Sequence, residues 1–193
     1  MARGVTAIPA LSLRRPGEGR TCWVLVGKRG QVCDNALMNA SECLRAAARI
    51  ESMAKDLYAE LAITFTHQPS LREMFERLAS EEAQHAMRIR LLERHHGRAP
   101  WSEAELGHFE VELDAMLAEI EAVRKLAGSA IGARSVGALL RRLTEMESRF
   151  GSIHAEELAK SASPEVRKLF ASLAAQDARH SEMLQKAADL SMA

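Results

Sequence analysis

The stretch from Leu71 to Leu92, LREMFERLASEEAQHAMRIRLL, decides the fold. Large residues recur along it at alternating intervals of four and three, which is the spacing of an inward-facing helical seam. Five of the seven seam positions are apolar, but the two in the middle are a carboxylic acid and an imidazole. A buried carboxylate is costly unless a partner compensates it, so the seam predicts a bundle helix that holds a cation. The seam positions are Leu71, Phe75, Leu78, Glu82, His85, Ile89 and Leu92.

The preceding segment has a seam of the same kind. Its apolar positions continue from Leu44 to Phe65, and Glu51 falls inside the apolar stripe rather than on the polar side. The two segments are separated only by the short stretch before Pro69, so they predict a helical hairpin. This hairpin would place Glu51 opposite Glu82 and His85.

The same hairpin occurs a second time in the chain. A shift of 95 residues places Phe75, Leu78 and His85 on Phe170, Leu173 and His180, and it places Glu82 on Asp177; a shift of 96 places Glu51 on Glu147. The acids and histidines lie about fifteen residues from the bend of each hairpin, or roughly 22 Å along a helix. Two hairpins packed together would therefore bring six side chains to one level: Glu51, Glu82, His85, Glu147, Asp177 and His180.

An oxygen-rich set with one imidazole for each metal suits iron or manganese better than a structural zinc. We assign Glu51 and His85 to one metal and Glu147 and His180 to the other. Glu82 and Asp177 would bridge the metals or chelate one of them. Asp177 is one methylene shorter than Glu82, so we expect two unequal metal positions.

Tyr58 and His154 occupy equivalent places in the two hairpins, seven residues after Glu51 and Glu147. Seven residues are about two helical turns, or about 10 Å, so neither side chain lies beside its own glutamate. We expect each to reach a ligand on the other hairpin as a hydrogen-bond partner. The alternative is that they are core polar residues with local partners.

The rest of the chain completes an all-α architecture. A helix predicted from Trp101 to about Leu126 would form the long crossover between the hairpins, giving a bundle over residues 39–193. Residues 1–38 form a non-helical extension, in which Cys22–Val26 and Gln31–Cys33 favour a small β-hairpin. A disordered tail is the alternative there.

Composition excludes several functions. The 193 residues carry no net charge, and only 4% are aromatic, so nothing favours binding to nucleic acid or to an anionic membrane. No apolar run approaches the roughly 20 residues of a membrane span. We therefore expect one cytoplasmic domain with a sizeable core.

These residues resemble the ferritin-like di-iron carboxylate proteins, in which two helices bearing glutamate alternate with two helices bearing Glu-x-x-His. Tyr58 sharpens this resemblance, because the rubrerythrin branch of the group has a tyrosine beside the metal site on its first helix. The resemblance implies a four-helix bundle made of two hairpins, with two iron ions, or manganese, as cofactors. The chain departs from full rubrerythrins in two respects: Asp177 replaces a glutamate, and no Cys-x-x-Cys iron module is present.

Three functions remain open at this stage. The first is a peroxidase or oxidoreductase active in oxidative stress, which we expect to form a homodimer. It would reduce hydrogen peroxide or O2 with an external rubredoxin-type or flavoprotein donor. The second is iron handling, meaning ferroxidase activity, storage or transfer of iron. The third is a non-enzymatic helical-bundle interaction protein with a vestigial site.

Overall fold

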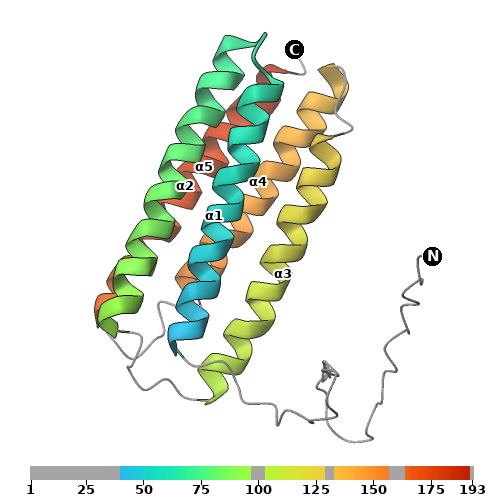
Figure 1. Ribbon diagram of the computed structural model, residues 1–193. Helices are drawn as coiled ribbons and strands as arrows, with labels where there is room; N and C mark the ends of the chain where they lie inside the picture. Colours follow the sequence, from blue (N-terminus) through green and yellow to red (C-terminus); the bar gives the residue numbers. More distant parts are fainter. Residues whose placement is uncertain (1–39, 97–102, 129–132, 157–163, 192–193) are drawn as a thin grey trace, which may run out of the picture. The chain divides into compact units, whose positions relative to one another are not determined.

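Five α-helices make up the part of the chain that the computed structural model describes, which is residues 40–96, 103–128, 133–156 and 164–191 (Figure 1). All five belong to one unit, residues 37–193. No strand occurs among the described residues. The helices are α1 (Ala40–Thr64), α2 (Pro69–His96), α3 (Glu103–Ala127), α4 (Ala133–Glu156) and α5 (Pro164–Leu190).

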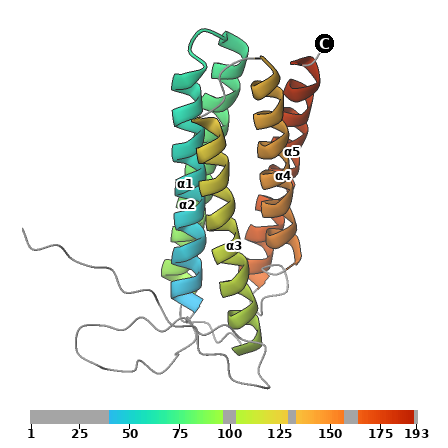
Figure 2. The same cartoon turned by 90° about the vertical axis from the view of Figure 1, so that its right-hand side faces the viewer.

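The helices pair as two hairpins joined by a crossover. α1 packs along α2, α4 packs along α5, and the hairpins meet where α2 contacts α5. α3 contacts both α1 and α4 and lies along one side of the bundle (Figure 2). This arrangement confirms the predicted ferritin-like bundle of two repeated hairpins with an extra helix in the crossover.

The hydrophobic core follows the predicted seams. Phe75, Leu78 and Ile89 of α2 are fully buried, and their counterparts Phe170 and Leu173 are fully buried on α5. Burial of each such side chain contributes about 1.5–3 kcal/mol. The core is therefore built from both hairpins, and the acids and histidines of the seams are buried within it.

Two expectations from the sequence concern other parts of the chain. The predicted β-hairpin within residues 1–38 lies outside the described residues. No helix among the described residues is long and apolar enough to cross a membrane.

Candidate metal centre

The six predicted ligands lie inside the bundle at one level. α1 supplies one of them, α2 supplies two, α4 supplies one and α5 supplies two. None of these side chains is more than 1% exposed, although all six can carry charge. The repeat thus places buried acids and histidines together from four helices: Glu51, Glu82, His85, Glu147, Asp177 and His180.

Glu82 lies between the two histidines. Its Oε2 atom is 2.9 Å from Nδ1 of His85, and its Oε1 atom is 2.9 Å from Nδ1 of His180. One carboxylate therefore presents one oxygen to each histidine. This is the arrangement in which a carboxylate can bridge two metal ions.

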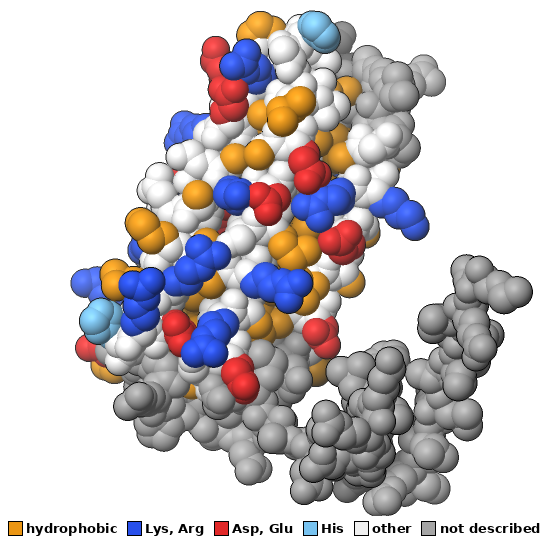
Figure 3. Space-filling view, in the orientation of Figure 1, with side chains coloured by type: hydrophobic (Ala, Val, Ile, Leu, Met, Phe, Trp, Pro, Cys, Tyr) orange, Lys and Arg blue, Asp and Glu red, His pale blue; other side chains and the backbone are white. Residues whose placement is uncertain are grey.

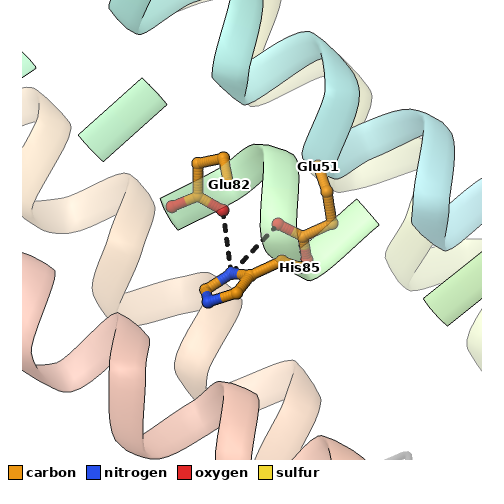
Figure 4. Close-up of side chains that lie close together, drawn as sticks. All are labelled: Glu51, Glu82 and His85. Atoms are coloured by element: carbon orange, nitrogen blue, oxygen red, sulfur yellow. Dashed lines mark ion pairs between the residues drawn. The ribbon is translucent and has the colours of Figure 1, made fainter. Parts of the chain in front are cut away.

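Each histidine also faces the glutamate of a second helix. Oε2 of Glu51 is 3.6 Å from Nδ1 of His85, and both carboxylates of the first hairpin point at this nitrogen (Figure 4). Oε2 of Glu147 is 3.3 Å from Nδ1 of His180. The candidate ligand atoms within each triad lie within 4.8 Å of one another, and Glu82 belongs to both triads.

Several buried atoms of the first triad make no conventional hydrogen bond and face only the carboxylates and imidazoles of the centre itself. They are both carboxylate oxygens of Glu51, both carboxylate oxygens of Glu82, and Nδ1 of His85. Buried polar atoms are nearly always satisfied, so a convergent group of unsatisfied ones indicates a missing partner. Carboxylate oxygens with one imidazole nitrogen per position form the donor set that iron or manganese prefers. The residues therefore fit the predicted pair of metal ions.

Asp177 does not mirror Glu82. Its Oδ2 atom is 2.7 Å from Nδ1 of His154, and its Oδ1 atom is 3.9 Å from Nδ1 of His85. Asp177 belongs to neither triad. The shorter acid contacts His154, so the two halves of the centre differ in structure. The unequal metal positions expected from Asp177 stay a prediction.

Tyr58 and His154 both cross from one hairpin to the other. The hydroxyl of Tyr58 on α1 donates a hydrogen bond to Oε1 of Glu147 on α4. In the opposite direction, Nε2 of His154 lies 3.3 Å from Oε1 of Glu51. The structure therefore places both residues against ligands of the other hairpin, where we expected hydrogen-bond partners.

Two further residues contact the outer ring nitrogens of the histidines. Nε2 of His180 is 2.7 Å from Oε2 of Glu81, and Nε2 of His85 is 2.7 Å from Oε1 of Gln176. Such contacts fix the ring so that Nδ1 faces the metal position. Sequence reasoning missed this pair, although the shift of 95 residues that relates the hairpins places Glu81 on Gln176.

The buried carboxylates raise the pKa values of the histidines at the centre. Burial acts to lower the pKa of His85, but contacts with Glu51 and Glu82 outweigh burial and raise it to about 10. Burial is likewise outweighed at His180, where Glu147 and Glu82 raise the pKa to about 11. Burial and the charge of Glu147 raise the pKa of Glu82 to about 8. The metal-free centre therefore balances its carboxylates with protonated imidazoles.

The pKa of Glu51 shifts in the direction opposite to that of Glu82. Burial acts to raise the pKa of this carboxyl, but the close imidazoles of His154 and His85 outweigh burial and hold the pKa well below its usual range. Glu51 is therefore ionised at neutral pH while neighbouring Glu82 tends to hold a proton. A metal ion entering the first triad would find one acid already charged.

Two helical hairpins around a buried set of carboxylates and histidines define a ferritin-like protein with a candidate two-metal site. The family model described as Rubrerythrin matches residues 42–188, and the chain belongs to this family. The match covers most of the bundle and every residue of the centre. No curated protein and no solved structure matches the chain.

Proposed function

We propose that the chain is a di-iron oxidoreductase of the rubrerythrin type, which reduces hydrogen peroxide or O2 with electrons from an external donor. The observation that carries this proposal is the position of Glu82, with one oxygen 2.9 Å from Nδ1 of each histidine. Two iron ions held against one shared carboxylate would supply one electron each to the same O–O bond. Membership of the rubrerythrin family supports the same class of chemistry.

The protein's own residues would supply protons to this reaction. Reduction of hydrogen peroxide to two water molecules consumes two electrons and two protons. Burial acts to lower the pKa of His154, but contacts with Asp177 and Glu51 outweigh burial and raise it to about 10, so its ring is protonated at neutral pH. Burial and the charge of Glu147 raise the pKa of Tyr58 well above its usual value, so its hydroxyl keeps its proton.

Aromatic rings pack against these two proton carriers and limit the access of water. The ring of Tyr58 stacks on Phe75 with centroids 6.1 Å apart, and the ring of His154 packs on Phe170 at 5.4 Å. Both phenylalanines are fully buried. This packing favours a confined substrate of two oxygen atoms over a large organic molecule.

The electrons would come from a donor outside these 193 residues. The sequence has three cysteines and no Cys-x-x-Cys pair that could hold a rubredoxin-like iron. We therefore propose a rubredoxin-type or flavoprotein donor that restores the reduced centre after each turnover.

Stopped-flow mixing tests the proposal. The protein is loaded anaerobically with Fe(II) and mixed with hydrogen peroxide or with O2 while its absorption is recorded. We expect oxidation by peroxide to be much faster than oxidation by O2. Faster reaction with O2, together with continued consumption of added Fe(II), would instead identify an iron-handling protein. A chain that retains no iron would be an interaction protein with a vestigial site.

A further inference from the structure

The outer face of the first hairpin carries a groove lined by arginines. The groove lies between α1 and α2 and has a volume of about 360 Å³. Arg45 and Arg49 are one turn apart on α1, and Arg90 and Arg94 are one turn apart on α2. Glu93 is the one acidic residue in its lining, which leaves a net charge of plus three. Basic side chains gather over this part of α1 and α2 in Figure 3.

Two of the arginines are held in place by neighbouring side chains. Arg45 forms an ion pair of 3.0 Å with Glu93 across the groove, and Arg90 donates a hydrogen bond of 2.7 Å to Ser52. These contacts reduce the side-chain entropy that a partner would have to remove on binding. The groove is therefore a partly ordered cationic surface.

Exposed apolar side chains continue the same face of α2. Met87 is 61% exposed and Leu91 is 55% exposed. Positions 87, 90, 91 and 94 lie on one stripe of a helix, so Met87 and Leu91 alternate with Arg90 and Arg94. Methionine and arginine are enriched where proteins bind each other. We call the four arginines with Met87 and Leu91 the arginine face.

The stripe on α2 is not repeated on α5, although the second hairpin repeats the first. The positions on α5 that are 95 residues after the stripe on α2 hold two acids, one amide and one lysine. Both hairpins carry ligands of the metal centre, so the centre itself does not require the difference. The replacements for Met87, Arg90, Leu91 and Arg94 are Glu182, Gln185, Lys186 and Asp189.

We propose that the arginine face is the docking surface for an acidic, one-electron carrier protein that reduces the metal centre. This rests on the proposed function. Its charge suits a partner with a carboxylate-rich surface, because complementary charge speeds and orients association. The N-terminal 39 residues are an unsuitable occupant, since six arginines and lysines against two acids give them a net charge of plus four.

The face is also close to the centre. Ser52, in the lining of the groove, directly follows Glu51, whose carboxylate points into the bundle. An electron entering at the groove therefore has about one helix diameter to cross, or about 10–12 Å. Reduction of one peroxide molecule takes two electrons, so two carriers dock in turn and each leaves oxidised by one electron.

The test compares two variants with the same change in net charge. Arg49→Glu combined with Arg94→Glu reverses the arginine face but keeps the Arg45–Glu93 and Arg90–Ser52 contacts. Arg179→Glu combined with Lys186→Glu makes the same change on exposed positions of α5. Each iron-loaded protein is oxidised with hydrogen peroxide, and its reduction by an acidic rubredoxin is then followed by stopped flow at low and high salt.

We expect the arginine-face variant to be reduced at least tenfold more slowly than the wild type at low salt. The difference should shrink at high salt, because salt screens exposed charges. The α5 variant should stay within twofold of the wild type. Reduced methyl viologen, a small cation that needs no docking surface, should reduce all three proteins at similar rates.

Other outcomes overturn the docking proposal. They are equal rates for the two variants, no reduction of the wild type by the rubredoxin, or a change of oligomeric state in the arginine-face variant during sedimentation. The last would make the face an interface between copies of the chain. Oxidation of the iron-loaded protein by hydrogen peroxide comes first in this test and requires no donor. If that oxidation fails, the result counts against the proposed function and not against the docking surface.

Discussion

Gly151 of α4 lies directly against Asp177 of α5. A Cβ atom at position 151 would be 3.3 Å from the Cβ atom of Asp177 and 3.6 Å from the backbone oxygen of Ala174. This close approach of the two helices gives a physical reason for the shorter acid. It also allows Oδ2 of Asp177 to reach His154 within the same hairpin.

Gly151→Ala should therefore disturb the centre more than the fold. Alanine raises helix propensity by about 1 kcal/mol, which offsets part of the crowding against Asp177. We expect the free energy of unfolding of the metal-free protein to change by about 1 kcal/mol or less, while the optical spectrum of the iron-loaded protein shifts. Gly128→Ala is the control, since a Cβ atom there meets only ordinary contacts of 3.7 Å and longer. Identical spectra for wild type and Gly151→Ala would contradict the prediction.

Glu82→Gln should cost the protein more metal than any other single carboxylate change. Glu82 belongs to both triads, whereas Glu147 belongs to one. We expect elemental analysis to give two iron ions for the wild type, fewer than one for Glu82→Gln and about one for Glu147→Gln. Glu60→Gln is the control, because Glu60 is exposed and pairs with Arg124. Two retained ions in Glu82→Gln would rule out the shared position.

Glu81 and Gln176 should make the two metal positions unequal. Nε2 of His180 faces a carboxylate, and Nε2 of His85 faces a neutral amide. A charged acceptor makes the imidazole a stronger ligand, and loss of such a partner lowers metal affinity by about 10- to 100-fold. We expect Glu81→Gln to weaken one of two binding steps and Gln176→Glu to strengthen the other.

Competition with a chromophoric chelator measures both steps. The double variant that exchanges the two residues, Glu81→Gln with Gln176→Glu, is the matched control because its composition and net charge equal those of the wild type. Two equal steps in the wild type, unchanged by either single substitution, would contradict this prediction.

Metal binding should release protons, and its affinity should rise with pH. The pKa values of His85 and His180 are raised to about 10 and about 11, so both rings are protonated in the metal-free protein at neutral pH. A metal at Nδ1 displaces that proton, and binding at Glu82 displaces another below its pKa of about 8. Calorimetry at pH 7 in buffers of different ionisation enthalpy should give between two and three protons released. A metal affinity that does not change between pH 6 and pH 8 would contradict this prediction.

The same shifts predict the stability of the metal-free protein. A histidine with a raised pKa in the folded state stabilises the fold fully below its unfolded value of about 6.5. That contribution is lost as the pH rises through the folded values of about 10 and 11. Unfolding in denaturant should therefore show lower stability at pH 9 than at pH 6, and bound metal should remove most of this dependence.

The bundle and the convergence of its polar residues could be predicted from the sequence, because both depend on periodicity. Glu51 and His85 lie in seams of alternating three- and four-residue intervals, and the repeat supplies Glu147 and His180 at equivalent positions. A residue inside such a seam must face the interior, whatever the details of packing. The buried positions of these side chains follow from that rule.

The contacts around Asp177, Glu81 and Gln176 could not be predicted, because they depend on distances between helices. The pairing of Asp177 with His154 requires the close approach that Gly151 permits. Glu81 and Gln176 each directly precede a seam acid, and by periodicity alone such positions face away from the core. Their contacts with the histidines of the other hairpin appear only when α2 and α5 lie side by side.

The reciprocal contacts between the hairpins also explain why a duplicated hairpin is useful. If two identical hairpins paired about a two-fold axis, every substitution would occur in both of them. Each substitution would then alter both metal positions in the same way. Because both hairpins lie in one polypeptide, Tyr58 could differ from His154, and Glu81 from Gln176, without a matching change across the axis. Covalent linkage thus releases the candidate centre from symmetry, so that each metal position can acquire its own affinity and its own reduction potential.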